Sequence, residues 1–469
     1  MSDRPTNDRS ASQRQTLAIV GGGIAGLACA YLLSARYDVW LFDKNDYLGG
    51  HTNTVTVTEA NGNSVAIDTG FMVFNPVTYP QLIRLFERLH VPTQTTDMSF
   101  SVQQVALGLE WNGAGWDKLF AQRKNLLNVR FWRMLLQLDR FNRDAKRLMQ
   151  RLEQGHAATL PAEEALEALE SLSIQDWVQR QGYGKDFLDW FLVPMSSAIW
   201  SSHPEQTLAF PARTLLRFFY NHGFLGLHGH HQWYTVTGGA QTYVKKLVAS
   251  RPELRQRLRT QRPVVAVERL TADGESERKT GGPVQLHWAD GETQVFDRVI
   301  LACHADEALQ LLRQPTPLEQ ELLTPFTYEA NTATLHSDVS VMPRCRRAWA
   351  SWNYRLSPPV SQQPPSLGVQ ASTHYWMNHL QRLSSQTPYF VSINGDHLIR
   401  PETIHYQTRY THPQFTVAAM QAQKRLEELN QPNQSVYFCG SYFRYGFHED
   451  AFASALALCK LLLGNHLVW

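Results

Sequence analysis

Apolar and polar positions follow two different periods in the first patterned stretch of the chain, residues 17–42. Residues 17–20 form a short apolar run of the kind that makes a buried parallel strand. From Ile24 the apolar residues recur at helical spacing, and residues 39–42 form a second apolar run. The pattern therefore predicts a strand, a helix and a second strand within the length of one βαβ unit.

Three glycines in the pattern G-x-G-x-x-G separate the first predicted strand from the helix. Gly21 permits a tight turn, Gly23 lets the backbone approach a pyrophosphate, and Gly26 lets helix and strand pack closely. Ile24 and Ala25 open the helix, where unpaired N–H groups and the helix dipole favour phosphate. The motif predicts a dinucleotide site, and the alternative is a strand-to-helix turn that binds no ligand.

An acidic residue, Asp43, stands at the end of the second predicted strand. Its carboxylate is placed to accept hydrogen bonds from both ribose hydroxyls of a dinucleotide. It would repel a 2′-phosphate, which disfavours NADP. We include the next residue, Lys44, in the predicted cofactor site.

Further periodic segments extend to the C-terminus. Residues 115–200 are predicted to be mainly helical, and alternation at residues 332–335 indicates a strand. Asp450 is expected to be the N-cap of the last helix. The other predicted helices are 80–90, 241–249 and 451–463, the other strands are 296–304 and 436–440, and a polar β-hairpin is expected over 270–293.

Composition narrows the class of protein. A chain of 469 residues suits about two or three domains. With 43% hydrophobic and 18% charged residues it is typical of soluble globular proteins, and a net charge of +2 gives no case for nucleic acid. No apolar stretch reaches the roughly 18 residues of a membrane span. Residues 1–15 are polar and are expected to be a disordered tail.

The cysteines and histidines do not occur at the spacings that are typical of metal ligands. The five cysteines are scattered and odd in number, which favours a reducing compartment and hence the cytoplasm. His228, His230 and His231 have no acidic or cysteine partner nearby in sequence, so we expect no metal site.

Residues 123–150 combine eight basic and two acidic residues with Phe131, Trp132, Leu135, Leu136 and Phe141. This pattern fits a surface that touches anionic lipid, peripheral at the inner face of the membrane. It also fits a helix pair with an apolar face in the core and solvated arginines, which we favour. The apolar stretches 190–200 and 215–227 are either the lining of a pocket for a lipophilic substrate or core.

The residues after Asp43 resemble FAD enzymes of the amine oxidase superfamily. Gly49-Gly50 followed by His51-Thr52 is similar to the extended fingerprint of that superfamily, whose second glycine pair also approaches the pyrophosphate. Asp68-Thr69-Gly70-Phe71 continues the resemblance, which implies that this turn passes close to the flavin ring. The resemblance therefore adds Gly49, Gly50, His51, Thr52, Gly70 and Phe71 to the predicted site.

The C-terminal half extends the same resemblance. Thr235-Val236-Thr237-Gly238-Gly239 is similar to the segment that re-enters the flavin domain, and Val264 matches the residue whose backbone holds the adenine. Residues 296–304 resemble the strand beneath the cofactor, so we expect Cys303 to be a buried small residue. The resemblance places Gly440, Ser441, Asp450 and Ala451 at the flavin edge, where a helix N-terminus favours reduction.

Two departures bear on the reaction. Ser441 stands where the superfamily usually has an acid. Many amine oxidases of the superfamily hold a water near flavin N5 with a lysine, but this chain has no lysine between Lys279 and Lys424.

The whole chain resembles a bacterial family of FAD-dependent oxidoreductases within this superfamily. The matching stretches are GGGIAGL, LGGHTNTV, DTGFMVFN, ILACHADEAL, LHSD, WASWNY and YGFHED. The resemblance implies hydride transfer between flavin N5 and a lipophilic substrate, an unsaturated or methylated fatty acyl chain of a phospholipid. His448 is our first candidate to move the proton and Tyr445 the second. The alternatives are an amine oxidase, a carotenoid-type desaturase or isomerase, and a flavin-binding protein without turnover.

The predicted architecture is α/β. A Rossmann-like FAD-binding domain is interleaved with a substrate domain made of a β-sheet and a helical cap. The FAD-binding parts are residues 16–75, 236–325 and 426–469; the substrate parts are the largely helical 76–235 and the sheet 326–425.

Overall fold

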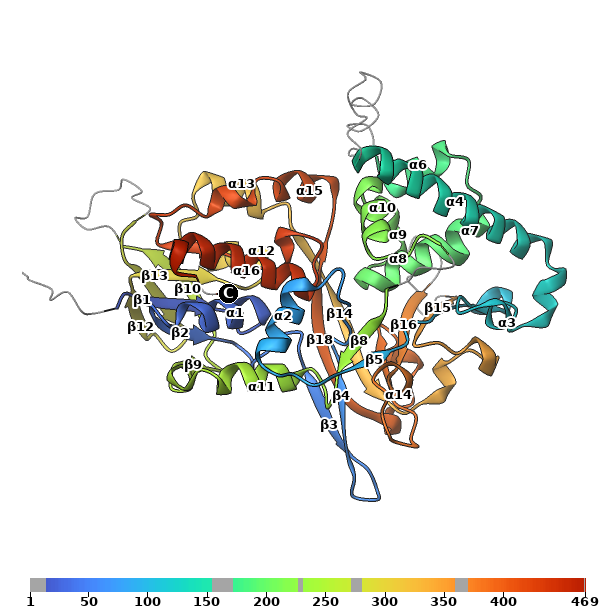
Figure 1. Cartoon of the computed structure of the whole chain (residues 1–469), viewed down its shortest axis with the longest axis horizontal. Coiled ribbons are helices and arrows are strands. Elements are labelled where there is room, and N and C mark those ends of the chain that lie inside the picture. Colours follow the sequence, from blue (N-terminus) through green and yellow to red (C-terminus); the bar gives the residue numbers. More distant parts are fainter. Residues whose placement is uncertain (1–13, 154–171, 227–230, 271–280, 359–369, 468) are drawn as a thin grey trace, which may run out of the picture. The chain divides into compact units, whose positions relative to one another are not determined.

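A computed structural model describes residues 14–153, 172–226, 231–270, 281–358, 370–467 and 469 (Figure 1). Residues 1–13 of the predicted tail, and His228 and His230, lie outside the described residues. The chain forms two compact units. Unit 1 comprises Met1–Gly50, Val244–Leu323 and Arg425–Trp469, and unit 2 comprises His51–Tyr243 and Thr324–Lys424.

Unit 1 is built on a five-stranded sheet in which all neighbouring strands are parallel. The helix α1 (Ile24–Leu33) connects the first two strands and is buried along its whole length, which explains its almost wholly apolar sequence. The second strand, β2, lies on one side of the first strand, β1, and the later strand β13 lies on its other side. The carboxyl end of β1 is therefore a topological switch point. In open parallel sheets, ligands bind at such points. The strand order is β19 (Val436–Phe438), β13 (Arg298–Leu301), β1 (Thr16–Val20), β2 (Asp38–Phe42) and β9 (Leu258–Arg259).

A smaller antiparallel sheet and a set of helices complete unit 1. The C-terminal helix α16 (His448–Leu463) packs against α1. The sheet contains β10 (Val264–Arg269), β11 (Val284–Trp288) and β12 (Thr293–Phe296). The other helices are α12 (Ala305–Leu311), α13 (Pro317–Leu323) and most of α11 (Gln241–Ala249).

Unit 2 contains a seven-stranded sheet. Neighbouring strands are antiparallel except for the parallel pair formed by β15 and β6. The strand order is β18 (Ile404–Gln414), β14 (Thr327–His336), β17 (Phe390–Ile393), β16 (Gln370–Trp376), β15 (Trp352–Ser357), β6 (Phe100–Gln104) and β7 (Leu109–Asn112). Two ribbons accompany it, β3 (Thr54–Thr58) with β4 (Ser64–Asp68), and β5 (Thr93–Thr96) with β8 (Trp233–Val236).

Most helices of unit 2 belong to the chain between residues 80 and 221. Aromatic side chains form their core, and Phe141 contacts the rings of Trp177, Phe187 and Phe219. Within the described residues of 190–200 and 215–227, most side chains are buried in this core. The helices are α2 (Pro80–Arg88), α3 (Trp116–Leu119), α4 (Val129–Glu153), α6 (Ile174–Arg180), α7 (Lys185–Phe187), α8 (Val193–Trp200), α9 (Pro204–Ala209) and α10 (Ala212–Asn221), with α14 (Met377–Leu380) and α15 (Val417–Gln423) later in the chain.

The division into units differs from the predicted domains at two points. Residues 51–75 and 236–243 fold with unit 2, although the sequence placed them with the nucleotide-binding part. The described part of the predicted hairpin 270–293 contains β11 and the start of β12.

In the described part of the chain, no helix combines the length and the apolar character that crossing a membrane requires.

Two neutral imidazoles are buried in the sheet of unit 2. The Asp338 N–H donates to Nδ1 of His336, so Nε2 of His336 carries the proton and donates to Ser392 Oγ at 2.7 Å. The Ser392 hydroxyl then donates to Nδ1 of His374 at 2.6 Å. Burial lowers the pKa of His336 to about 4 and that of His374 well below its usual range.

We therefore expect unit 2 to lose stability in acid. A histidine whose folded pKa is lowered contributes stability above its unfolded pKa of about 6.5, and that contribution falls as the pH approaches the folded value. For His336 the loss amounts to about 2 kcal/mol at pH 5. Urea unfolding at pH 7 and pH 5 measures it, and His336→Gln should reduce the pH dependence. Equal pH dependence in wild type and variant would contradict this assignment.

Candidate functional site

The glycine turn lies at the carboxyl end of β1, at the switch point of the unit 1 sheet. Gly21 donates its N–H to the Phe42 carbonyl at 2.9 Å and has φ of +110°, a conformation that favours glycine. A Cβ on Gly21 would lie 2.6 Å from the carbonyl oxygen of Ala302, the residue that follows the neighbouring strand β13. The turn is therefore fixed between two strands, as the motif predicts.

Gly26 and Gly23 are glycines for different reasons. A Cβ on Gly26 would lie 1.9 Å from the Gly21 carbonyl oxygen, so the close packing of α1 on the turn requires glycine there. A Cβ on Gly23 would meet no described atom within 4 Å, and the φ of Gly23 is −71°. The protein's own packing therefore does not explain Gly23, whereas a phosphate approaching the backbone does.

The N-terminus of α1 adjoins Gly23. Gly23 is the N-cap residue, and no described side chain caps the first turn. Ile24 and Ala25 are buried at the first positions of the helix. The first-turn N–H groups and the positive end of the helix dipole therefore remain free of a competing side-chain oxygen, which suits a pyrophosphate.

The Asp43 carboxylate is buried and bonded on both oxygens. Oδ2 accepts the Gly22 N–H at 2.5 Å, and Oδ1 accepts the Asn45 N–H at 2.7 Å. Burial raises the pKa of Asp43. A carboxylate offers about four acceptor positions, so two remain for ribose hydroxyls. Lys44 is largely exposed and its ammonium contacts the Glu307 carboxylate at 2.5 Å.

The second glycine pair meets the first motif. Gly49 forms an isolated parallel bridge with Gly23 and donates its N–H to the Gly22 carbonyl at 2.8 Å. A Cβ on Gly50 would lie 3.1 Å from the Gly23 Cα. Gly49 and Gly50 thus lie beside the glycine turn. This arrangement fits an FAD-binding site better than it fits a strand-to-helix turn that binds no ligand.

The other predicted unit 1 residues lie on β10 and at the start of α16. Val264 is the first residue of β10, where the pairing with β11 has a bulge. Gly440 follows β19 and donates its N–H to Ser454 Oγ at 2.9 Å, while Ser441 begins a short 3₁₀ turn and Ala451 is buried in α16. Their contacts with a cofactor remain predictions.

The prediction that Asp450 is an N-cap is wrong. The last helix begins at His448, three residues before the expected start, and Phe447 is the N-cap residue. Asp450 lies in the first turn and accepts the Phe447 N–H at 3.0 Å. Burial raises its pKa to about 7. The error arose because the strand-to-helix loop is tighter than the spacing of apolar residues indicates.

The two predicted proton carriers flank this helix start. His448 is the first residue of α16 and is half-buried, and desolvation lowers its pKa to about 3. The imidazole is therefore neutral at physiological pH. Tyr445 precedes Gly446 in the loop before the helix. Whether either takes part in the reaction remains a prediction.

The predicted residues of unit 2 form a group of their own. His51 accepts the Phe71 N–H on its carbonyl at 2.8 Å, and a Cβ on Gly70 would lie 2.1 Å from the same oxygen. The Thr52 hydroxyl bonds to the Tyr243 hydroxyl at 2.7 Å. The structure therefore brings His51, Thr52, Gly70 and Phe71 together.

Tyr410 lies beside these groups and was not predicted, and Asp68 was named only as part of the predicted turn. The Tyr410 ring stacks on the His51 ring with centroids 4.9 Å apart, and its hydroxyl bonds to Thr69 Oγ1 at 2.7 Å. Asp68 accepts two bonds from the Ala240 N–H and one from the Gln381 side chain. Burial raises the pKa of Asp68 to about 7. Gly22 was also missed, and a Cβ there would lie 2.9 Å from both Asp43 Oδ2 and Leu48 Cδ2, which explains a third glycine in the turn.

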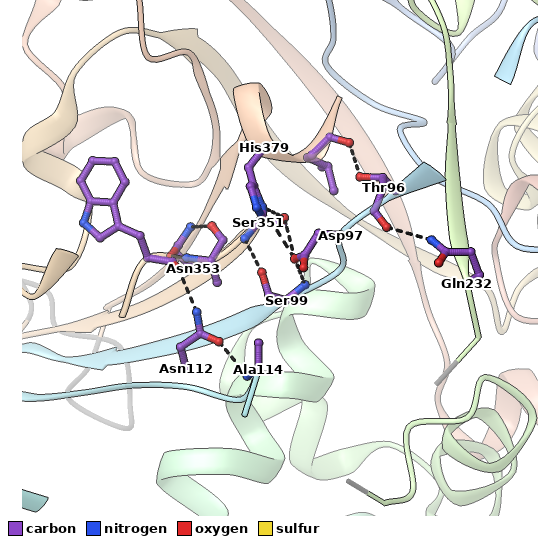
Figure 2. Close-up of polar contacts among 12 residues, drawn as sticks. Thr96, Asp97, Ser99, Asn112, Ala114, Gln232, Ser351, Asn353 and His379 are labelled. Atoms are coloured by element: carbon purple, nitrogen blue, oxygen red, sulfur yellow. Dashed lines mark hydrogen bonds and ion pairs between the residues drawn. The ribbon is translucent and has the colours of Figure 1, made fainter. Parts of the chain in front are cut away.

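Among the described residues, one Ser-His-Asp cluster is not arranged as a catalytic triad, and no metal site is found. Ser351, His379 and Asp97 meet in unit 2 (Figure 2), but Ser351 Oγ and Asp97 Oδ1 both approach Nδ1 of His379, at 2.8 and 3.7 Å. A catalytic triad uses opposite ring nitrogens. No group of three His, Cys, Asp or Glu residues among the described residues has a metal-binding arrangement.

Cys303 has a thiol of low reactivity. It is half-buried at the end of β13, and burial raises its pKa well above the usual range. Because the thiolate is the reactive form, a raised pKa disfavours a nucleophilic role. The sequence predicted a buried residue here, whereas the side chain is only half-buried.

The sequence matches the model of one protein family. The family model described as flavin-containing amine oxidoreductase matches residues 24–334, well over half of the chain. No curated protein matches the sequence.

Solved structures share the fold over nearly the whole chain. The fatty acid isomerase from P. acnes that produces CLA is 16% identical, with a TM-score of 0.62 and coverage of 96% of this chain and 99% of that one. Cyclohexylamine oxidase from Brevibacterium oxydans IH-35A is 15% identical, with a TM-score of 0.61 and coverage of 95% and 99%. Putrescine oxidase with bound putrescine is 14% identical, with a TM-score of 0.61 and coverage of 95% and 97%. The predicted α/β fold, with an FAD-binding domain and a substrate domain, is thereby confirmed.

Proposed function

The chain belongs to the flavin-containing amine oxidoreductases and is an FAD-dependent oxidoreductase, and we propose that its substrate is a fatty acyl chain. Only the substrate is proposed here. The fold does not determine it, because amine oxidases and a fatty acid isomerase share this fold. Bound FAD supplies a two-electron acceptor for hydride at its N5 atom.

The absence of lysine from the unit 2 sheet is the observation that carries the proposal. The described strands of that sheet contain no lysine, whereas resemblance to the superfamily implies a lysine-held water in many amine oxidases. The fatty acid isomerase supports the proposal further, since it shows that this fold serves a protein acting on a fatty acid.

The unit 1 residues would hold the cofactor by three groups. The backbone at Gly23 and the first turn of α1 would bind the pyrophosphate, and Gly49 and Gly50 would let it approach closely. The Asp43 carboxylate would bind the ribose hydroxyls. The N-terminus of α16 would place partial positive charge where the reduced ring gains negative charge.

The chain would also move a proton. Removing hydride from one acyl carbon requires the loss of a proton from its neighbour, and the electron pair of that C–H bond then forms the double bond. His448 is our first candidate to accept this proton, and its imidazole is neutral at physiological pH. Tyr445 is the second candidate.

Replacing His448 with asparagine tests that role. If His448 accepts the proton, His448→Asn should lower the rate of flavin reduction roughly 100-fold while FAD stays bound, because general bases contribute about that much. Stopped-flow absorbance at the oxidised flavin band measures the rate. A variant that reacts at nearly the wild-type rate would remove His448 from the mechanism.

Anaerobic mixing tests the substrate class. The FAD-loaded protein is mixed with vesicles of dioleoyl phosphatidylglycerol, and separately with putrescine or cyclohexylamine. We expect the lipid to be altered in the number or position of its double bonds, as measured by mass spectrometry, with at least transient bleaching of the flavin. Bleaching by an amine alone would overturn the proposal in favour of amine oxidation. Inertness toward both lipid and amine would favour a flavin-binding protein without turnover, and turnover of a polyene alone would favour a carotenoid-type enzyme.

A further inference from the structure

Large apolar side chains are exposed together at one place in unit 2. Among the described residues, twelve large apolar side chains are exposed, and six of them lie within residues 116–136. This concentration separates the segment from the rest of the surface, where such residues are scattered singly. We call these six the α3–α4 surface: Trp116, Leu126, Leu127, Val129, Trp132 and Leu136.

Contacts and helical spacing connect most of the six residues. The Trp116 ring stacks on Phe120, whose ring also contacts Trp132 with centroids 5.1 Å apart. The Trp132 indole donates to the Leu126 carbonyl at 2.9 Å. Val129, Trp132 and Leu136 follow one face of α4 at helical spacing.

The helix α4 also has a second apolar face, which is buried. Phe131, Met134 and Phe141 are buried in the core of the helical part, so they supply the packing that holds α4 in place. Trp132 and Leu136 lie outside that core and are 38% and 69% exposed. The core interpretation of the sequence therefore holds for Phe131 and Phe141, but it does not account for the exposed Trp132 and Leu136.

The charges around the α3–α4 surface are mainly positive. Within residues 116–136 the basic residues are Lys118, Arg123, Lys124, Arg130 and Arg133, against the single acid Asp117. Arg123 pairs with Asp117, and Arg130 pairs with Asp186 at 2.6 Å. Arg133 is exposed and makes no ion pair with any described residue. Basic residues around exposed Trp and Leu are the arrangement that binds an anionic bilayer surface.

A pocket beside this surface provides polar donors. It has a volume of about 220 Å³ and is lined by Lys124, Asn125, Asn128 and Arg130, among others. Asn125 is 1% exposed, and its Nδ2 has no hydrogen-bond partner among the described residues. The Lys124 ammonium, which also donates to the Gly108 carbonyl at 3.1 Å, supplies a cation for the phosphate of a lipid headgroup, whereas Arg130 is already paired with Asp186.

We propose that the α3–α4 surface docks on a bilayer containing anionic phospholipids, with a headgroup phosphate in the adjoining pocket. The tryptophans and leucines enter the headgroup region while the basic residues contact the negative lipids. The proposal goes beyond the oxidoreductase activity, because binding to a membrane is independent of which substrate is oxidised. It also gives a reason for large apolar residues to remain exposed on an otherwise polar protein.

Vesicle flotation tests the proposal with the FAD-loaded full-length protein. Vesicles of phosphatidylcholine with roughly one-third phosphatidylglycerol are compared with pure phosphatidylcholine. We expect wild-type protein to float with the anionic vesicles at least roughly tenfold more than with the neutral ones. Leu127→Asp changes a side chain that is 90% exposed and should lower flotation roughly tenfold. Arg133→Gln should lower it less, and only with the anionic vesicles.

Val77→Asp is the matched control, because Val77 is 60% exposed in the same unit and does not belong to the α3–α4 surface. It should float like wild type, and equal FAD content in all variants shows that they are folded. Failure of wild type to float, or equal flotation of Leu127→Asp, would overturn the proposal. A wild-type dimer in sedimentation velocity that Leu127→Asp converts to monomer, without vesicle binding by either, would assign the surface to a second copy instead. None of these results depends on turnover.

Discussion

Replacing Gly26 with alanine is expected to unfold unit 1 or prevent it from folding. The added Cβ would lie 1.9 Å from the Gly21 carbonyl oxygen, and neither atom can rotate away because the backbone fixes the positions of both. Separating them requires α1 to move from the sheet, where all ten of its residues are buried. Overpacking of a core costs about 1–3 kcal/mol or more, a large share of the roughly 5–15 kcal/mol that stabilises a domain.

Thermal unfolding and the flavin content of the purified protein measure the effect of Gly26→Ala. Gly113→Ala is the matched control, because its Cβ would lie 3.7 Å or more from its neighbours. The control should behave like wild type, whereas Gly26→Ala should be poorly expressed, free of FAD and unfolded at lower temperature. A Gly26→Ala protein with wild-type stability would show that the packing of α1 on the turn is looser than the structure indicates.

Replacing Asp43 with alanine is expected to have the second largest effect. The carboxylate accepts buried N–H groups from Gly22 and Asn45, and we infer that it also binds the ribose. Its loss leaves these donors without a partner. FAD retention should weaken by about 1–3 kcal/mol, the usual cost of unpaired buried groups, and the glycine turn should become less rigid.

Asp46→Ala separates this effect from a general change of charge in the same loop. Asp46 is exposed, so its removal should leave FAD affinity unchanged. Fluorescence titration of the apoprotein with FAD measures both variants. Unchanged affinity in Asp43→Ala would mean that the ribose is held by other residues.

Local patterns in the sequence predicted the elements of unit 1 well. The strand-glycine-helix-strand order gave both ends of β1 and β2 and the start of α1 within about one residue. The helix α11 has the predicted bounds. These elements are predictable because a buried parallel strand and a buried helix have few alternatives once their apolar periods and the glycines are known.

Contacts between distant segments were less predictable. The unit boundary falls between Gly50 and His51, inside a stretch whose local pattern continues without a break. Gly22 has no assigned role in the glycine motif, yet its N–H bonds to the Asp43 carboxylate 21 residues later. Tyr410 approaches His51 from a strand more than 350 residues later, and a single sequence carries no signal for that pairing.

The exposed face of α4 shows a second limit of sequence analysis. Phe131 and Trp132 are neighbours in one apolar and basic segment, yet the first is buried and the second is exposed. The helical period predicts that they point in different directions. It does not determine which direction faces the core, because that depends on the helices that pack against α4.

The central claim is that the glycine turn of unit 1 exists to hold the pyrophosphate of FAD. Gly23→Ala tests it most directly, because the added Cβ meets no described atom of the protein within 4 Å. We predict apoprotein with wild-type unfolding temperature, but FAD affinity lowered roughly ten- to hundredfold by the loss of a hydrogen bond to a charged phosphate. A Gly23→Ala protein that binds FAD as tightly as wild type would contradict the claim.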